Sequence, residues 1–187
     1  TPLGEKGDHI IQRLADRLAA LDLLERATQL LEHQIKFRTT ASARSQVGAR
    51  LALLHLLNQR PQEALSVLEV TNYGGNSPEL QIQRQQLTAE ALMKLNKNDE
   101  ALGVINNDTT KAGALLRMEI LWAMQDWPSI ANHAEDILGA RPNLTDPLTP
   151  QETEVLLKLA LAYTFEGDYT QLRYLRDYYA NLIPDTA

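Results

Sequence analysis

The chain has 187 residues, of which 44% are hydrophobic and 22% are charged; this composition excludes a wholly disordered protein, and the length allows a sizeable core. The formal net charge of −6 argues against general nucleic-acid binding, because neutralising phosphates requires clustered cations. The absence of cysteine excludes disulfides and thiolate metal sites, and it leaves cytoplasm and periplasm equally open.

The sequence also bears on the membrane and on the parent protein. No apolar run reaches the roughly 18 residues that a membrane span needs, since charges such as Lys158 interrupt the longest candidates. The chain starts at Thr1 without Met, so we expect the N-terminus of the parent protein to be missing. We interpret the chain as one domain of a larger bacterial protein, located in the cytoplasm or the periplasm.

Helix formers dominate the whole length. Leu, Ala, Gln and Glu are abundant beside only two Phe and two Trp, which predicts an all-α protein. Short breaks such as LNQRPQEA, LNKNDEA, MQDWPSIA and FEGDYTQL join consecutive helices and force antiparallel pairs. Helix starts are marked by Ser77-Pro78 and by a capping box in Thr149-Pro150-Gln151-Glu152. We expect a single domain over residues 1–187, with helix pairs at 8–37, 43–72, 77–107, 110–142 and 149–184.

These pairs have the properties of a repeat. A helix pair folded back at the Gly167-Asp168 corner cannot bury both apolar faces alone, so it must stack on a neighbouring pair. The units align on one residue shortly after each corner, and the gaps between these residues are 37, 37, 29 and 42. That spacing averages near the ~34-residue period of tetratricopeptide repeats. The aligned residues are Ala27, Ala64, Ala101, Ile130 and Leu172.

On these residues the chain resembles a tetratricopeptide-repeat (TPR) protein. The second and third units have Ala52 with Ala64 and Ala89 with Ala101, whereas the fourth has Met118 where a small residue is expected. The first unit is weakest and retains only Ala15, Ala27 and Leu31. The last unit carries the pattern best, with Leu159-Ala160, Tyr163, Gly167, Tyr169 and Pro184.

The resemblance implies a right-handed α-solenoid, or superhelix, of about five antiparallel helix pairs. It also implies a protein–protein interaction scaffold or adaptor that binds a peptide or helical segment of a partner in a concave groove. We predict no catalytic residue, no metal and no cofactor. Matching the inward-facing spacing of the family places ten residues on this face: Arg50, Leu53, Leu57, Gln83, Gln86, Glu90, Met93, Lys94, Glu119 and Trp122.

Several of these residues have a second interpretation. Met93 and Trp122 are equally consistent with core positions between units, because apolar residues at helical spacing are often core. Glu90 and Lys94 are four residues apart on one helix, so an exposed pair that stabilises this helix is favoured over a partner contact.

Two other functions compete with the adaptor hypothesis. The last helix has an apolar stripe of Leu175, Tyr179, Leu182 and Ile183 with no following helix to cover it, which would suit self-association or assembly within a larger protein. A catalytic helical domain is the less favoured alternative. Its nearest constellation is NHAED, where His133, Glu135 and Asp136 diverge around a helix. We interpret His55 as a packed core ring.

Overall fold

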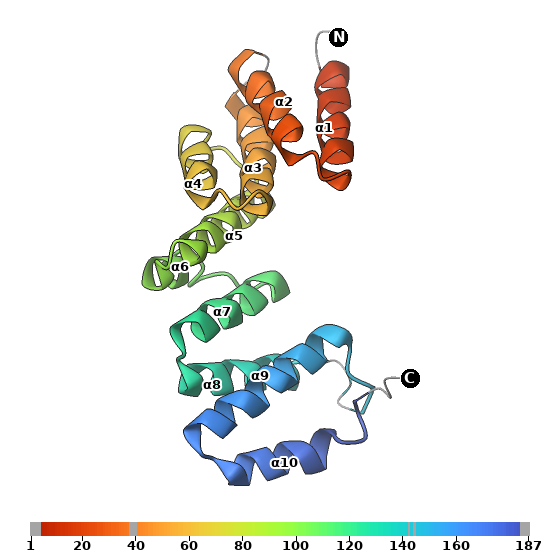
Figure 1. Ribbon diagram of the computed structural model, residues 1–187, viewed down its shortest axis with the longest axis vertical. Coiled ribbons are helices and arrows are strands. Elements are labelled where there is room, and N and C mark those ends of the chain that lie inside the picture. Colours follow the sequence, from red (N-terminus) through yellow and green to blue (C-terminus); the bar gives the residue numbers. More distant parts are fainter. Residues whose placement is uncertain (1–4, 38–40, 142, 144, 184–187) are drawn as a thin grey trace. The chain divides into compact units, whose positions relative to one another are not determined.

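The computed structural model describes residues 5–37, 41–141, 143 and 145–183. These ranges contain ten α-helices and no strand, which confirms the all-α prediction. The chain divides into two compact units, Thr1–Asp108 and Thr109–Ala187, and each is described by itself (Figure 1). No helix within the described ranges is long and apolar enough to cross a membrane.

The helices are divided between the two compact units. Both Pro142 and Pro184, expected at the ends of the fourth and fifth pairs, lie outside the described residues. The first unit contains α1 (Glu5–Ala20), α2 (Leu24–Phe37), α3 (Ala41–Leu57), α4 (Pro61–Val70), α5 (Pro78–Lys94) and α6 (Asn98–Val104). The second unit contains α7 (Lys111–Met124), α8 (Trp127–Gly139), α9 (Pro150–Glu166) and α10 (Tyr169–Tyr179).

One corner motif closes all five pairs. In each corner one residue has left-handed backbone, with φ between 56° and 76°. The N–H of the next residue donates to the carbonyl five residues earlier, as from Asp168 to Tyr163 at 2.9 Å. This is the Schellman ending, which satisfies carbonyls that the helix leaves unpaired. The left-handed residues are Asp22, Gln59, Asn96, Gln125 and Gly167.

The predicted helix starts are confirmed. The Ser77 hydroxyl accepts a hydrogen bond from the Leu80 backbone N–H at 3.3 Å. At the start of α9 the Thr149 hydroxyl accepts from the Glu152 N–H at 3.3 Å, and the Glu152 carboxylate accepts from the Thr149 N–H at 2.8 Å. The backbone hydrogen bond from Thr149 lowers the pKa of Glu152, because it stabilises the carboxylate.

Small residues let helices approach closely where the repeat pattern places them. Ala52, Ala64, Ala89 and Ala101 have no exposed surface. In the first unit α5 packs against both α3 and α4. Leu87 and Ala91 of α5 thereby enter a shared core whose other members, from α3 and α4, are Ala49, Ala52, Leu56, Ala64 and Leu68.

In the second unit α8 lies between α7 and α9, and α10 packs on α9. Within the described residues no helix follows α10, and there Ala160 and Leu172 are only half-buried. Leu175 is buried, so part of the predicted uncovered stripe packs within the hairpin itself. Tyr179 and Leu182 are half-buried and Ile183 is exposed.

Candidate functional site

On α3 the predicted binding residues share one helix face. Leu53 and Leu57 are exposed, although both are large and apolar. Arg50 is engaged within the unit, because its guanidinium binds the Asp16 carboxylate of α1, with Nε 2.7 Å from Oδ1. The side chains of Arg50 and Asp16 are 40% and 48% exposed, so the pair contributes little stability and a partner carboxylate can compete for Arg50.

The predicted residues on α5 form a more polar face. Glu90 and Lys94 make the expected pair along one helix, with Nζ 3.9 Å from Oε1. Gln86 donates from its side-chain amide to the Asp108 carboxylate at 2.7 Å, and Gln83 is exposed. Met93 is half-buried, which leaves both interpretations of this residue open.

Aromatic side chains from three helices meet in the second unit. Trp122 of α7 lies edge-on to Trp127 of α8, with ring centroids 5.3 Å apart. Trp127 in turn stacks on Phe165 of α9 at 4.5 Å. Phe165 is 59% exposed, while both tryptophans are half-buried. Trp122 is therefore neither a fully buried core residue nor an isolated groove residue, but one end of an aromatic cluster that reaches the surface.

Charged groups flank this cluster along α7 and α9. Lys158 of α9 contacts Glu119 of α7, the predicted binding residue one turn before Trp122. The same ammonium lies 3.2 Å from Glu154. Only 14% of the Lys158 side chain is exposed, whereas Glu119 is 46% and Glu154 66% exposed. A cation covered by two carboxylates thus forms a polar border beside the aromatic rings.

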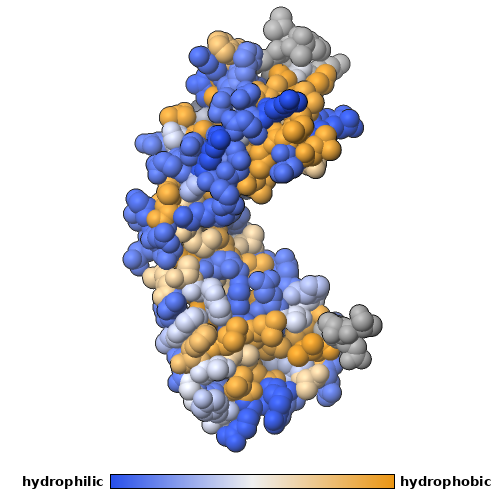
Figure 2. All heavy atoms as spheres, viewed as in Figure 1, coloured by the Kyte–Doolittle hydropathy of each residue, from blue (hydrophilic) through white to orange (hydrophobic). Residues whose placement is uncertain are grey.

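Sequence reasoning missed the apolar residues of α9. Leu157, Leu161 and Phe165 follow one another at intervals of four residues and are all exposed. The signal was present. In the third unit Gln86, Glu90 and Lys94 lie at fixed distances along the chain from Ala89. The same distances from Ala160 in the last unit give Leu157, Leu161 and Phe165. Figure 2 shows apolar surface over the region of α8 and α9.

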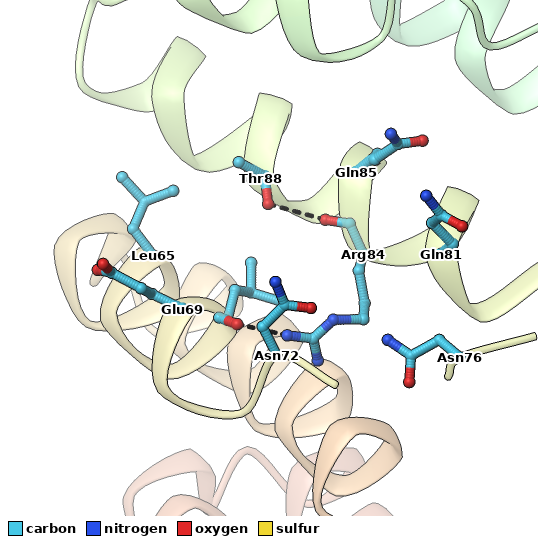
Figure 3. A pocket seen from close by; sticks show the side chains of 9 residues that line it. Leu65, Glu69, Asn72, Asn76, Gln81, Arg84, Gln85 and Thr88 are labelled. Carbon is cyan, nitrogen blue, oxygen red and sulfur yellow. Dashed lines mark hydrogen bonds between the residues drawn. The ribbon is translucent and has the colours of Figure 1, made fainter. Parts of the chain in front are cut away.

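A polar cavity of about 420 Å³ lies beside α4 and α5, around the buried Arg84 (Figure 3). The guanidinium donates to the backbone carbonyls of Ser45, at 2.7 Å, and of Leu68. It also lies 3.4 Å from the Thr71 hydroxyl. Burial lowers the pKa of Arg84 below its ordinary value, because desolvation disfavours the charged guanidinium. Since carbonyls occupy its donors, Arg84 holds helices together rather than reacting with a ligand.

The histidines contact different parts of the fold. His55 is 4% exposed, which confirms its assignment to the core. Burial lowers its pKa, and the opposing effect of Glu32, 3.9 Å away, is smaller. In NHAED, His133 Nε2 lies 2.8 Å from the Ala114 carbonyl of α7, while Glu135 accepts a hydrogen bond from Tyr163 of α9. His133 and Glu135 thus contact different helices, whereas His133 and Asp136 line one pocket, so the expected divergence of these two residues is wrong. No group of three or more His, Asp or Glu in the described ranges is arranged to hold a metal.

No family model matches the chain, and comparison with curated proteins and with solved structures likewise finds no match.

Proposed function

We propose that this chain is a protein–protein interaction scaffold whose helix pairs stack as a right-handed α-solenoid of the TPR type. The Schellman corner that recurs in all five pairs supports a repeat architecture, because the repeated use of one local structure is typical of repeat proteins. The partner segment, a peptide or a helix, binds along the exposed faces of the first helices of the pairs.

One observation carries the binding proposal, namely the apolar surface of α9 beside the aromatic cluster. Leu161 is 44% exposed and Phe165 59% exposed, and they lie on one helix face. Contiguous apolar surface on a folded domain marks interaction sites more often than scattered single residues do. Trp side chains supply much of the binding energy in such sites. The Glu119–Lys158–Glu154 border supplies the polar rim that interfaces usually have.

The geometry favours a partner segment with two or three apolar anchors spaced about one helical turn apart. Such a segment matches the four-residue spacing on α9 when it lies along the helix. The helices are folded before binding, so little ordering cost falls on this chain and most of it falls on the partner.

The test is a selection of random peptides displayed on phage against the full chain, followed by binding measurements on the selected peptides. Leu161→Asp and Phe165→Asp place charges on the proposed surface, and we expect each to weaken binding by about tenfold or more. Val70→Asp is the matched control, because Val70 is 69% exposed on α4. Circular dichroism establishes that all variants are folded.

The proposal is wrong if the selected peptides bind the two α9 variants as tightly as they bind wild type and the Val70 control. Trp122→Ala provides a second check on the same surface, since removing this ring takes away one end of the cluster. Capture from a native cell lysate then identifies which proteins depend on Phe165.

A further inference from the structure

The last hairpin carries a second surface, on the side of α9 that faces α10. An open groove of about 460 Å³ runs between the two helices. Its walls are almost entirely apolar and include Leu157 and Ala160 of α9, Leu172 of α10, and Ile183 beyond it. Two arginines of α10, Arg173 and Arg176, also line the groove.

The hairpin α9–α10 repeats the hairpin α3–α4 in register. α4 begins at Pro61 and α10 at Tyr169, an offset of 108 residues. The same offset relates Ala52 to Ala160 and Ala64 to Leu172. Both hairpins also turn through the same left-handed corner, at Gln59 and Gly167. Residues of the two hairpins can therefore be compared position by position.

The comparison identifies what the equivalent groove of α3–α4 contains. There α5 contacts both helices and buries Leu87 and Ala91 against Ala49, Ala52 and Ala64. The counterparts of these three alanines are Leu157, Ala160 and Leu172, which line the open groove. The groove of α9–α10 thus reproduces a surface that elsewhere in this molecule is covered by an amphipathic α-helix.

One chemical difference distinguishes the two grooves. Where α4 has Leu65 and Leu68, α10 has Arg173 and Arg176. Among the residues that the structure describes, Arg176 pairs with its neighbour Asp177, at 2.7 Å, and both side chains are about two-thirds exposed. An exposed pair of this kind is weak, so Arg176 is free to bind an incoming carboxylate.

The charges also indicate which occupant is disfavoured. α1 exposes Ile10 and Leu14 and is the obvious apolar helix by which a second copy would dock. Arg13 and Arg17 lie on the same stripe of α1, at helical spacing from Ile10 and Leu14. Docking α1 into this groove would bring cations against Arg173 and Arg176, which costs free energy.

We propose that the groove between α9 and α10 binds an amphipathic α-helix of a partner protein, with Leu and Ala on its apolar face and acidic residues facing α10. This groove borders the apolar surface of α9 and shares Leu157 with it, but Leu161, Phe165 and the tryptophans do not line the groove, so its binding is tested independently of that surface.

The probe is a helix-stapled peptide with the sequence of α5, residues 78–94, because α5 fills the equivalent groove. Gln81, Arg84 and Thr88 of α5 line the same cavity as Leu65 and Leu68, so they mark the side that would face the arginines. One peptide has Glu at these three positions, and a matched peptide has Lys there. Fluorescence anisotropy measures the binding of both to the full chain.

We expect the Glu peptide to bind at least about fivefold more tightly than the Lys peptide, as two charge pairs of exposed type allow. In the R173E/R176E variant the preference should reverse. Ala160→Trp fills the groove, and Ile183→Asp places a charge at its rim, so each should abolish binding of the Glu peptide. Val70→Asp on α4 is the control and should leave binding unchanged.

Melting curves of each variant establish that it is folded, and Ile183→Asp decides the question if Ala160→Trp does not fold. Equal binding of the two peptides, or binding that survives both groove variants, would overturn the proposal. Light scattering tests whether a second copy of the chain is the occupant. A dimer of the wild-type chain that Ile183→Asp converts to a monomer would show that a second copy fills the groove, and would also overturn it.

Discussion

Gly167 allows a direct test of the fold, because a side chain at this position would strain the backbone without contacting any neighbouring atom. Gly167 has φ of 76°, and a Cβ placed on it meets no atom within 4 Å. Gly167→Ala therefore introduces backbone strain without a steric clash. A left-handed conformation costs a residue with a Cβ about 1–2 kcal/mol. Alanine also has less backbone freedom than glycine in the unfolded chain, which stabilises the folded protein by about 0.4–1 kcal/mol.

The expected net effect is a decrease of about 1 kcal/mol in the free energy of unfolding of the second unit. The matched control is Gly139→Ala in the same unit. Gly139 lies in α8, a Cβ there also meets nothing within 4 Å, and its φ is not left-handed. Gly139→Ala reduces the backbone freedom of the unfolded chain and favours the helix, and it adds no strain. It should therefore raise the free energy of unfolding by about 0.4–1 kcal/mol.

Urea denaturation followed by circular dichroism gives both values, and an unchanged denaturant slope shows that each variant changed stability and not the denatured state. The opposite signs of the two changes are the result that matters. If Gly167→Ala stabilised the protein as Gly139→Ala does, residue 167 would not be left-handed in solution, and the Schellman account of the corners would be refuted.

Two further predictions concern the first unit. A Cβ on Gly48 would lie 2.0 Å from the Thr71 hydroxyl, which donates a hydrogen bond to the Val67 carbonyl at 2.6 Å. Gly48→Ala should therefore lower the free energy of unfolding by about 1–3 kcal/mol. An unchanged midpoint of thermal unfolding would contradict the close approach of α3 to the end of α4. Burial lowers the pKa of His55 below its ordinary value of 6.5, so the unfolded chain binds a proton first and stability should fall as pH drops below about 6.5. His55→Gln should remove this part of the pH dependence in urea titrations between pH 5 and 8, and an identical slope in both proteins would disprove it.

Much of the local structure was predictable because short-range interactions determine it. The start of α9 follows from Thr149 and Glu152, which cap the helix within one turn. The glycine at 167 likewise predicted the last corner. At two further corners Asp22 and Asn96 belong to residue types that adopt left-handed backbone more readily than most, whereas Gln59 and Gln125 do not. The conformation of these two glutamines follows from the packing of the two helices that each corner joins.

The candidate surfaces were only partly predictable. The repeat spacing selected Glu90 and Lys94, and the same spacing applied to the last unit finds Leu161 and Phe165. It did not reveal that Trp127 would join the rings of Trp122 and Phe165, since this residue begins a different helix. Nor did it reveal that Arg50 would bind Asp16, 34 residues earlier in the chain.

By itself the sequence determined an all-α chain whose helices are joined by short corners, because periodicity, capping and turns act over a few residues. Only the tertiary structure decided which side chains remain exposed or find a partner, as with Arg84 buried among carbonyls of α3 and α4. It also decided that the groove beside Arg173 and Arg176 stays open while its counterpart is filled by α5. The reason is physical: burial and ion pairing depend on which helices meet in space, and no local pattern encodes that meeting.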